Sequence, residues 1–416
     1  MKHLINSFCN ACCLALAVAM MHSCDDENNG VSVDSLSMGE AVISLTGLNN
    51  DLSGLDVQVR NINTNSVFIA QSSADGVASF CVTPGIYEAS VSASRRDDKN
   101  AYIYNGVSGQ FTVFNDKTTK VALPMKQVRI SPLVIKELYC GGCMMDDGVT
   151  AFQLDKCVIL YNNSNEPLSL DNLCFGMVAP ANAQTANNNY NEDGRLNYED
   201  EGFLPMWNGI WYFPSTLVIQ PYSEIVVNIY GAINNTLTVS QSIDYANSEY
   251  YCMFDPESGY SNPRYYPTPS EVIPTSHYLK AVFYALGNAW PLSNTSPALV
   301  LFQTHGKTPQ ELASDVSGYW YDGGGSQTSR RCIKVPNEWV IDAVEVFSTD
   351  YSTQCVKRLT ADVDAGYVWL TNKMGHSLCR RIDGQATAAS GGHTVYVDTN
   401  NSTNDFYEIQ SCSLKK

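Results

Sequence analysis

Short runs of alternating apolar and polar residues, separated by turn residues at roughly ten-residue intervals, recur from Ala41 to Gln127. In "GLDVQVRN", Leu55, Val57 and Val59 alternate with other residues, and "GVASFCVTPGIYEASVSA" holds two such runs around Pro84-Gly85. Successive side chains of a strand point to opposite faces, so a period of two predicts strands with one buried face. Many short strands with regular turn signals are typical of an antiparallel β-sandwich. The sequence therefore predicts an all-β fold.

The order of these runs, "L.V.V.N" followed by "ADG.ASF.V.PG.YE.SVS", resembles the carboxypeptidase-regulatory and transthyretin-like Ig modules of surface proteins. In such modules a turn like Asp75-Gly76 joins two strands, and a pair like Pro84-Gly85 opens the next strand. The resemblance implies an Ig-like β-sandwich over residues 41–127 that spaces or presents a neighbouring domain. No binding or catalytic site is evident in this part of the sequence.

A second set of strand-like runs fills residues 128–416, and opens with "VRISPLVIKELYC" and "DKCVILYNNSNEPLSLDNLCFG". It continues through "WNGIWYFPSTLVIQPYSEIVVNIYGAINN", "SPALVLF", "WVIDAVEVF" and "HSLCRRIDG". This order resembles lamin-tail-type Ig sandwiches, and over residues 128–410 it is more closely similar to the Bacteroidetes family DUF4876. The resemblance implies a second, tandem sandwich with long irregular loops. It implies no established activity.

The second set of runs departs from that family at several positions. Cys140-Gly-Gly-Cys143 stands where the family's first strand ends in aromatic and small residues. Ile159 replaces an acidic residue of the next strand, and Cys157 and Cys174 stand where aromatic residues are expected. A shared site that depends on the acidic residue would be absent from this chain.

The amino terminus, "MKHLINSFCNACCLALAVAMMHSC", has one lysine, an apolar run and a small polar stretch that ends at Cys24. The apolar run is too short for a stable membrane span, and the pattern predicts a signal peptide over residues 1–23. "MMHSC" is a loose lipobox, which predicts lipidation of Cys24 and a stable lipid anchor in the outer membrane. Ordinary secretion is the alternative, because Met21 and His22 differ from the usual lipobox residues.

"CDDENNG" follows the lipobox and resembles the export signal of surface lipoproteins in the Bacteroidetes. We therefore expect a flexible acidic tether over residues 24–40 and display at the cell surface. A solvated tether on the periplasmic side is the alternative, since charge and Asn/Gly suit both. Without residues 1–23 the chain has 24 basic and 42 acidic residues, a formal charge of −18. Such a charge repels phosphate backbones, so nucleic acid is an unexpected partner.

"LYCGGCMMDDG" places Cys140 and Cys143 three residues apart. One CxxC without a second pair is a weak zinc signal, and it does not open a helix as a thioredoxin-like motif does. Met144 adds a soft sulfur ligand, so a copper or zinc site built from Cys140, Cys143 and Met144 is one hypothesis. The favoured interpretation is that the two cysteines form a structural disulfide or simply belong to a turn. A third hypothesis is that they take part in redox exchange.

Two long segments lack apolar periodicity and are predicted as loops. Residues 181–201, "ANAQTANNNYNEDGRLNYEDE", offer carboxylate and amide oxygens for calcium, but the spacing is not that of an EF-hand. Residues 245–269 contain six tyrosines, an amphipathic contact residue that suits recognition. The candidate recognition residues are four tyrosines of this loop, Tyr250, Tyr251, Tyr265 and Tyr266, and two tryptophans of "MWNGIWYFP", Trp207 and Trp211, which offer a platform on which a sugar can stack. The alternatives are that the tyrosines cover the sheet and that the tryptophans anchor the core.

No catalytic residue can be named from the sequence. G-x-S-x-G, H-E-x-x-H and a complete P-loop are absent, and the four histidines beyond residue 24 are scattered. The first hypothesis is therefore a non-catalytic surface lipoprotein that captures a small-molecule or glycan ligand, or assists a TonB-dependent transporter. The second is a surface hydrolase of glycan or peptide with carboxylates from the loops, and the third is a soft-metal-binding lipoprotein.

Overall fold

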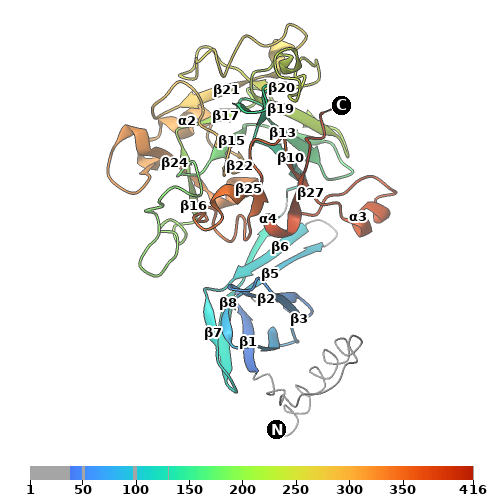
Figure 1. The fold of residues 1–416 in the computed structure, drawn as a ribbon, viewed down its shortest axis with the longest axis vertical. Coiled ribbons are helices and arrows are strands. Elements are labelled where there is room, and N and C mark those ends of the chain that lie inside the picture. Colours follow the sequence, from blue (N-terminus) through green and yellow to red (C-terminus); the bar gives the residue numbers. More distant parts are fainter. Residues whose placement is uncertain (1–37, 49–51, 97–100, 130, 416) are drawn as a thin grey trace. The chain divides into compact units, whose positions relative to one another are not determined.

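The computed structural model describes residues 38–48, 52–96, 101–129 and 131–415. The predicted signal peptide, Cys24 and the tether as far as residue 37 lie outside these ranges. Gly39 and Glu40, at the end of the predicted tether, already belong to the first strand. Nearly all regular structure is β-strand (Figure 1), which confirms the predicted all-β class. Within the described ranges, no helix has the length and apolar character needed to cross a bilayer.

The chain divides into two compact units, the first with residues 1–91 and 106–125 and the second with residues 92–105 and 126–416. The amino-terminal strands are β1 (Gly39–Thr46), β2 (Asp56–Asn61), β3 (Val67–Gln71), β4 (Val77–Val82), β5 (Gly85–Arg96), β6 (Ala101–Val107), β7 (Phe111–Val113), β8 (Thr118–Pro124) and β9 (Lys126–Arg129). They form one sheet of order β4-β1-β8 and another of order β3-β2-β5-β6-β9, with β7 beside β5.

Strand β1 shows why the alternation in this part of the sequence gives a sandwich. Ala41, Ile43 and Leu45 are buried while the residues between them are partly exposed. The strand pairs with β4 in antiparallel and with β8 in parallel orientation. Strand β4 begins directly after Gly76, whose φ is +68°, and β5 begins at Gly85, where the sequence indicated a turn and a new strand. The more specific Ig-like assignment stays a prediction.

The second unit is built around a long, folded sheet of order β26-β25-β22-β15-β17-β21-β20-β19-β13-β10-β27-β28. Its strands are β10 (Leu133–Tyr139), β13 (Lys156–Asn162), β15 (Leu173–Met177), β17 (Gly209–Tyr212), β19 (Glu224–Tyr230), β20 (Tyr251–Met253), β21 (Tyr278–Phe283), β22 (Ala298–Gln303), β25 (Val340–Ser348), β26 (Val368–Leu370), β27 (Ser377–Arg380) and β28 (Phe406–Ile409). Smaller sheets contain β11 (Cys143–Met144), β12 (Ala151–Phe152), β14 (Leu168–Leu170), β18 (Leu217–Ile219), β16 (Phe203–Trp207), β23 (Tyr319–Tyr321) and β24 (Arg331–Pro336).

The helices within the described ranges are short. The α-helices are α2 (Pro309–Ser314), α3 (Gly384–Ala389) and α4 (Ser402–Asp405), and the 3-10 turns are η1 (Asn235–Leu237), η2 (Thr275–His277), η3 (Val316–Gly318), η4 (Thr328–Arg330), η5 (Asn337–Trp339) and η6 (Thr349–Tyr351). Helix α2 has a complete capping box, in which Thr308 and Glu311 bond each other's main-chain N–H groups.

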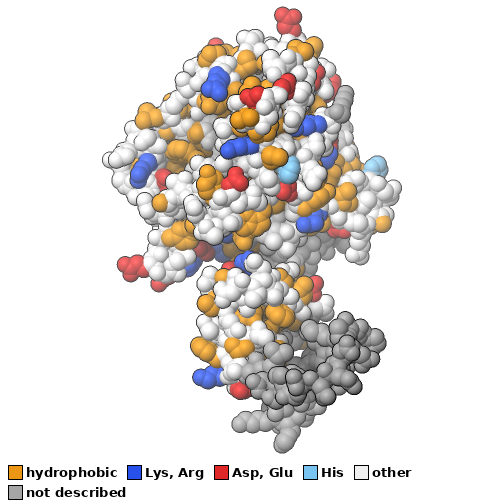
Figure 2. All heavy atoms as spheres, in the orientation of Figure 1, with side chains coloured by type: hydrophobic (Ala, Val, Ile, Leu, Met, Phe, Trp, Pro, Cys, Tyr) orange, Lys and Arg blue, Asp and Glu red, His pale blue; other side chains and the backbone are white. Residues whose placement is uncertain are grey.

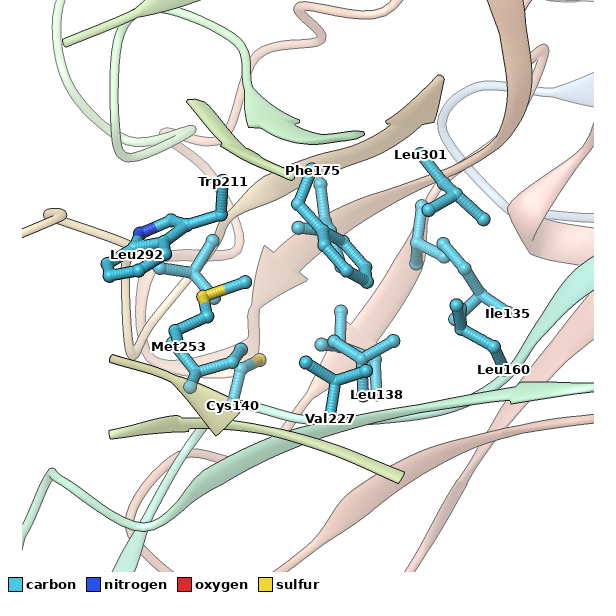
Figure 3. Close-up of a cluster of buried hydrophobic side chains, with 14 of the residues drawn as sticks. Ile135, Leu138, Cys140, Leu160, Phe175, Trp211, Val227, Met253, Leu292 and Leu301 are labelled. Carbon is cyan, nitrogen blue, oxygen red and sulfur yellow. The ribbon is translucent and has the colours of Figure 1, made fainter. Parts of the chain in front are cut away.

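The main apolar core lies between the two halves of the folded sheet. Leu138 and Val227 come from β10 and β19, and Phe175 and Leu301 come from β15 and β22. Figure 3 shows these side chains meeting between two layers of strands. All four are fully buried, and burial of apolar area is the main favourable contribution to folding.

A second core explains why strand β15 is buried at all five positions. Phe175 points into the main core, whereas its neighbour Cys174 belongs to a separate cluster with Leu204 of β16 and Ile333 of β24. Alternate side chains of β15 thus enter two different cores. The sheet β16-β24-β23 therefore adds a third layer to the predicted sandwich.

A buried arginine joins strands of the two halves of the sheet. Arg380 of β27 forms an ion pair with Asp342 of β25 and donates from Nε to the main-chain oxygen of Ile135 in β10, at 2.8 Å. Asp398 and Asp405 lie 3.2 and 3.4 Å from the same guanidinium group. A charge removed from water is tolerated only when it is paired and hydrogen-bonded. The network therefore fixes the carboxy-terminal segment against the sandwich.

Candidate functional site

The second unit contains an open cleft of about 930 Å³. Five stretches of sequence contribute to its lining, together with Tyr230 at the end of β19. The lining residues of these stretches are Met145, 150–154 and Lys156; 181–182; 207–208; Asn262, Arg264 and Tyr265; and 286–294. Two of these stretches belong to loops that the sequence singled out, because residues 181–182 begin the polar loop and residues 262–265 lie in the tyrosine-rich loop. A volume of this size can hold a small ligand such as an oligosaccharide unit.

The wall of the cleft is held by hydrogen bonds to Trp290, which is fully buried. The main-chain nitrogen of Trp290 donates to the hydroxyl of Tyr266 at 3.0 Å, and its carbonyl accepts from the hydroxyl of Tyr230. The indole Nε1 donates to the carbonyl of Gly209 at 3.0 Å. These three hydrogen bonds hold Trp290 in place, so this part of the wall is formed before any ligand arrives.

Lys156 is the buried cation of the cleft. It is the first residue of β13, and the side chain is almost completely buried, with the residue 2 % exposed. Its ammonium group donates to the main-chain oxygen of Leu292 and lies over the ring of Tyr230, 5.1 Å from the centroid. Burial lowers the pKa of Lys156 to about 8, against the opposing influence of nearby Cys140. Within the described residues no carboxylate pairs with it.

Other polar side chains line the same cleft. Arg264 is exposed and has no ion-pair partner among the described residues. Asn262 donates to Asn288 across the cleft lining at 3.2 Å, and its own oxygen accepts from the main-chain nitrogen of Arg264. Asn208 is buried and has φ +72° in the turn between β16 and β17, a conformation that asparagine tolerates. The lining thus offers several amide donors and acceptors at fixed positions.

The lining contains no acidic residue. The chain has 42 Asp and Glu among 416 residues, yet none of the 24 residues that line the cleft is acidic. On the face seen in Figure 2, acidic and basic side chains are scattered without a broad patch of one sign. The cleft therefore combines two cations, amide groups and aromatic rings, a composition suited to binding a polar or anionic molecule.

Two of the predicted recognition residues line the cleft and two are buried. Trp207 is half-buried and donates from Nε1 to the carbonyl of Ser329 at 3.0 Å, and Tyr265 packs edge-on against Tyr230. Trp211 and Tyr266 do not line the cleft, and their burial fits the alternative interpretation, in which these rings anchor the core or cover the sheet. Trp211 is fully buried in the main core (Figure 3), and Tyr266 is 6 % exposed because its ring packs on Trp211 and its hydroxyl holds Trp290.

Tyr250 and Tyr251, the other two predicted recognition residues, do not line the cleft. Tyr251 stacks on His277 with a centroid distance of 4.1 Å and packs edge-on against Phe213. Tyr250 packs against a small apolar cluster around Tyr245. The alternative interpretation, that the tyrosine-rich loop covers the sheet, describes these two residues.

The Cys140-Gly-Gly-Cys143 motif forms a turn at the end of β10. The Cys140 thiol lies in the main core (Figure 3), and burial raises its pKa to about 12. Gly142 has φ +71°, and a Cβ there would lie 2.4 Å from the carbonyl oxygen of Phe152. Cys143 and Met144 form the short strand β11, and no disulfide joins Cys140 to Cys143. The motif therefore serves a tight turn, which the favoured interpretation allowed.

The metal hypotheses find no support in the geometry. In the described residues, no group of three or more His, Cys, Asp or Glu side chains is arranged to hold a metal ion. Cys140 points into an apolar core, so Cys140, Cys143 and Met144 do not form an accessible soft-metal site. In the polar loop, Asp200 is occupied by Arg195, 2.6 Å away, and Glu199 lies 3.3 Å from the same guanidinium group. These carboxylates form ion pairs with arginine instead of a calcium site.

Three residues of the cleft, Lys156, Asn208 and Arg264, were not predicted from the sequence. Lys156 directly precedes the apolar run "CVILY", so a lysine at the start of a fully buried strand was an available signal. The Asn208-Gly209 pair between two apolar runs is a recognised turn signal. Nothing in the sequence marks Arg264, which becomes notable only because the fold places it beside the cleft.

Part of the chain matches a known family model. Residues 220–413 match the family described as "Protein of unknown function (DUF4876)". The match begins after β18, so residues 128–219 of the expected range lie outside it, together with Lys156 and Trp207. The family description names no activity. No curated protein matches the chain.

The fold is similar to that of a solved DUF4876 family protein from Bacteroides thetaiotaomicron. That similarity has a TM-score of 0.58 and 22 % sequence identity, and it covers 91 % of this chain and 97 % of the other. An identity this low shows a shared fold alone. Two other solved structures are too distant to support an argument. One is the Bacillus anthracis TIE protein, with a TM-score of 0.18 and 15 % identity, covering 46 % of this chain and 28 % of the other. The second is a DUF3823 family protein from Parabacteroides merdae, with a TM-score of 0.16 and 13 % identity, covering 35 % of this chain and 67 % of the other.

Proposed function

We propose that this chain is a non-catalytic binding protein of the bacterial cell surface, and that the cleft of the second unit captures a saccharide. The observation that carries the proposal is the lining of the cleft, which has aromatic rings, amides and two cations but no carboxylate. Amide groups donate and accept hydrogen bonds, as the hydroxyl groups of a sugar do. Trp207 and Tyr265 offer rings with partly exposed faces on which a sugar ring can lie.

The same lining favours capture over hydrolysis. Glycoside hydrolysis uses a pair of carboxyl groups on either side of the scissile bond. No acidic residue lines the cleft, so a glycan held there meets no such pair. The hydrogen-bonded wall around Trp290 is also typical of a site that is formed before ligand binding.

The proposed location rests on the amino-terminal sequence. A lipid on Cys24 and an acidic tether would hold the folded units at the outer membrane. From there a captured saccharide could be passed to a TonB-dependent transporter, which is the partner we propose. Purification of the intact protein from crosslinked cells, with mass spectrometry of what copurifies, tests the partnership. Recovery of the protein without any transporter would contradict it.

Capture itself is tested by screening the folded protein, from residue 38 onward, on an array of plant, host and microbial oligosaccharides. The Trp207→Ala and Tyr265→Ala variants should lose the binding that the wild type shows. A Tyr351→Ala variant is a matched control, because Tyr351 is exposed and lies outside the cleft. Equal binding by the wild type and the cleft variants would contradict the proposal, and so would the absence of any binding.

A further inference from the structure

We infer that the saccharide captured in the cleft is acidic, with a carboxylate or sulfate group that binds at Lys156. This inference rests on the proposed function, because it names the class of saccharide that the same cleft takes. The juxtaposition that supports it is a buried ammonium group and an exposed guanidinium group in a cleft without acidic residues.

Lys156 is a cation without a counter-ion. Its ammonium group has three N–H donors, and within the described residues only the carbonyl of Leu292 accepts from it. The ring of Tyr230 supplies a weak additional attraction to the positive charge. A buried charge is normally paired, so an unpaired one that lines an open cleft is an incomplete binding site. An anionic group of a ligand would complete it.

Arg264 extends the positive potential to the rim. The side chain is exposed, and its main-chain nitrogen bonds to Asn262, which fixes the local turn. The whole chain has a formal charge of −17 and therefore repels anions at long range. At the cleft, two cations without an acidic residue among the lining residues attract an anion instead of repelling it. An anionic ligand is therefore directed to the cleft and away from the rest of the surface.

The other groups of the lining favour a sugar as the carrier of the charge. Four side-chain amides line the cleft, those of Asn182, Asn208, Asn294 and Gln153. The Asn182 amide accepts hydrogen bonds from Ser293 and Thr295, whereas the other three amides form no hydrogen bond within the described residues. Several free amides match a molecule with many hydroxyl groups better than they match a peptide, whose groups are mostly main-chain amides. Uronic acids and sulfated sugars both combine several hydroxyl groups with an anionic group.

The test uses matched pairs of probes and isothermal titration at pH 7. One pair is hexagalacturonate and its fully methyl-esterified form, and the other is a κ-carrageenan hexasaccharide, whose only anionic groups are sulfates, and its desulfated form. We expect at least one acidic probe to bind at least tenfold more tightly than its partner. The pair that shows the difference identifies the anion as carboxylate or sulfate.

Lys156→Met should remove that preference. Arg264→Gln, an exposed substitution that cannot disturb the core, should reduce the preference by severalfold. Lys307→Met removes the same charge from an exposed lysine outside the cleft and should change nothing. Equal affinity for acidic and neutral partners would overturn the inference and leave saccharide capture intact. Binding of no acidic probe, or a preference for an acidic peptide over every saccharide, would overturn it as well.

Discussion

The ammonium group of Lys156 lies 5.1 Å from the ring centroid of Tyr230 and donates to the carbonyl of Leu292, at the edge of an otherwise apolar core. A lysine placed there lowers the stability of the fold, because the charge leaves water without gaining a counter-ion. Tyr230 and Leu292 both line the cleft, so the destabilising charge lies where a ligand can bind. The arrangement is the reason to regard this cleft as a binding site.

Replacement of Lys156 by Met should make the protein more stable at pH 7. The pKa in the folded state, about 8, is below the ordinary value of 10.5, so the unfolded chain binds more protons between these values. The charge on Lys156 therefore lowers the free energy of unfolding by its full amount below pH 8, and this effect disappears as the pH rises toward 10.5. We expect a gain of about 1–3 kcal/mol at pH 7 and a smaller gain at pH 10, measured by urea denaturation. A loss of stability at pH 7 would show that Lys156 is a structural residue.

Binding of an acidic saccharide should weaken at alkaline pH. Two titratable residues lie near the Lys156 ammonium group, Cys140 and Tyr230, and burial raises the pKa of each, so both stay neutral up to pH 9. The affinity should therefore fall about tenfold between pH 7 and pH 9 as Lys156 loses its proton. Titration calorimetry at both values tests this, and the Lys156→Met variant should show no such fall.

Stability should rise as the pH falls from 7.5 to 5.5. One guanidinium group, that of Arg380, faces three buried carboxyl groups, and burial raises the pKa of Asp342 to about 7 and those of Asp398 and Asp405 to about 6. Above the unfolded value of 3.8, the folded state then binds more protons, so protonation stabilises it in this window. Urea denaturation at the two pH values measures the effect. If an Asp398→Asn variant shows the same difference in stability between the two pH values as the wild type, groups other than Asp398 cause that difference.

Neighbouring aromatic residues should separate into stability and binding classes. Trp211→Ala and Tyr266→Ala remove rings from the core and should cost about 3–5 kcal/mol each. Trp207→Ala and Tyr265→Ala should cost much less stability but should abolish saccharide capture. Thermal denaturation and array binding of the four variants distinguish the classes. A large loss of stability in Tyr265→Ala without loss of binding would contradict the assignment.

The turn between Cys140 and Cys143 should not tolerate a side chain at its second glycine. Gly142→Ala combines a positive φ with a Cβ 2.4 Å from the carbonyl oxygen of Phe152, and should cost more than about 2 kcal/mol. Gly148→Ala is the matched control, because its φ is +68° and a Cβ there has open space. Its cost should be limited to the backbone strain, about 1 kcal/mol. Equal costs in chemical denaturation would contradict the steric argument.

Local pattern predicted the strands well. The alternation of Ala41, Ile43 and Leu45 identified β1, because one face of that strand is buried and the other is not. The same reasoning could not show that Cys174 and Phe175 enter two different cores, because a strand buried on both faces has no alternation.

The cleft could not be predicted from the sequence because its residues meet only through long-range contacts. Lys156 bonds to Leu292, 136 residues further along the chain, and no periodicity links such distant positions. Tyr265 and Tyr266 are adjacent in an irregular loop, so nothing in their spacing indicated that one lines the cleft and the other is buried. The loops were correctly singled out, but the long-range fold decides which of their residues meet.

The most direct test of the account is a crystal structure of the protein soaked with the acidic oligosaccharide that binds best at pH 7. We predict electron density in the cleft, with a carboxylate or sulfate oxygen within about 3 Å of the Lys156 ammonium group and a sugar ring against Trp207 or Tyr265. An oligosaccharide bound elsewhere, with the cleft occupied by water alone, would contradict the assignment of this cleft as the binding site.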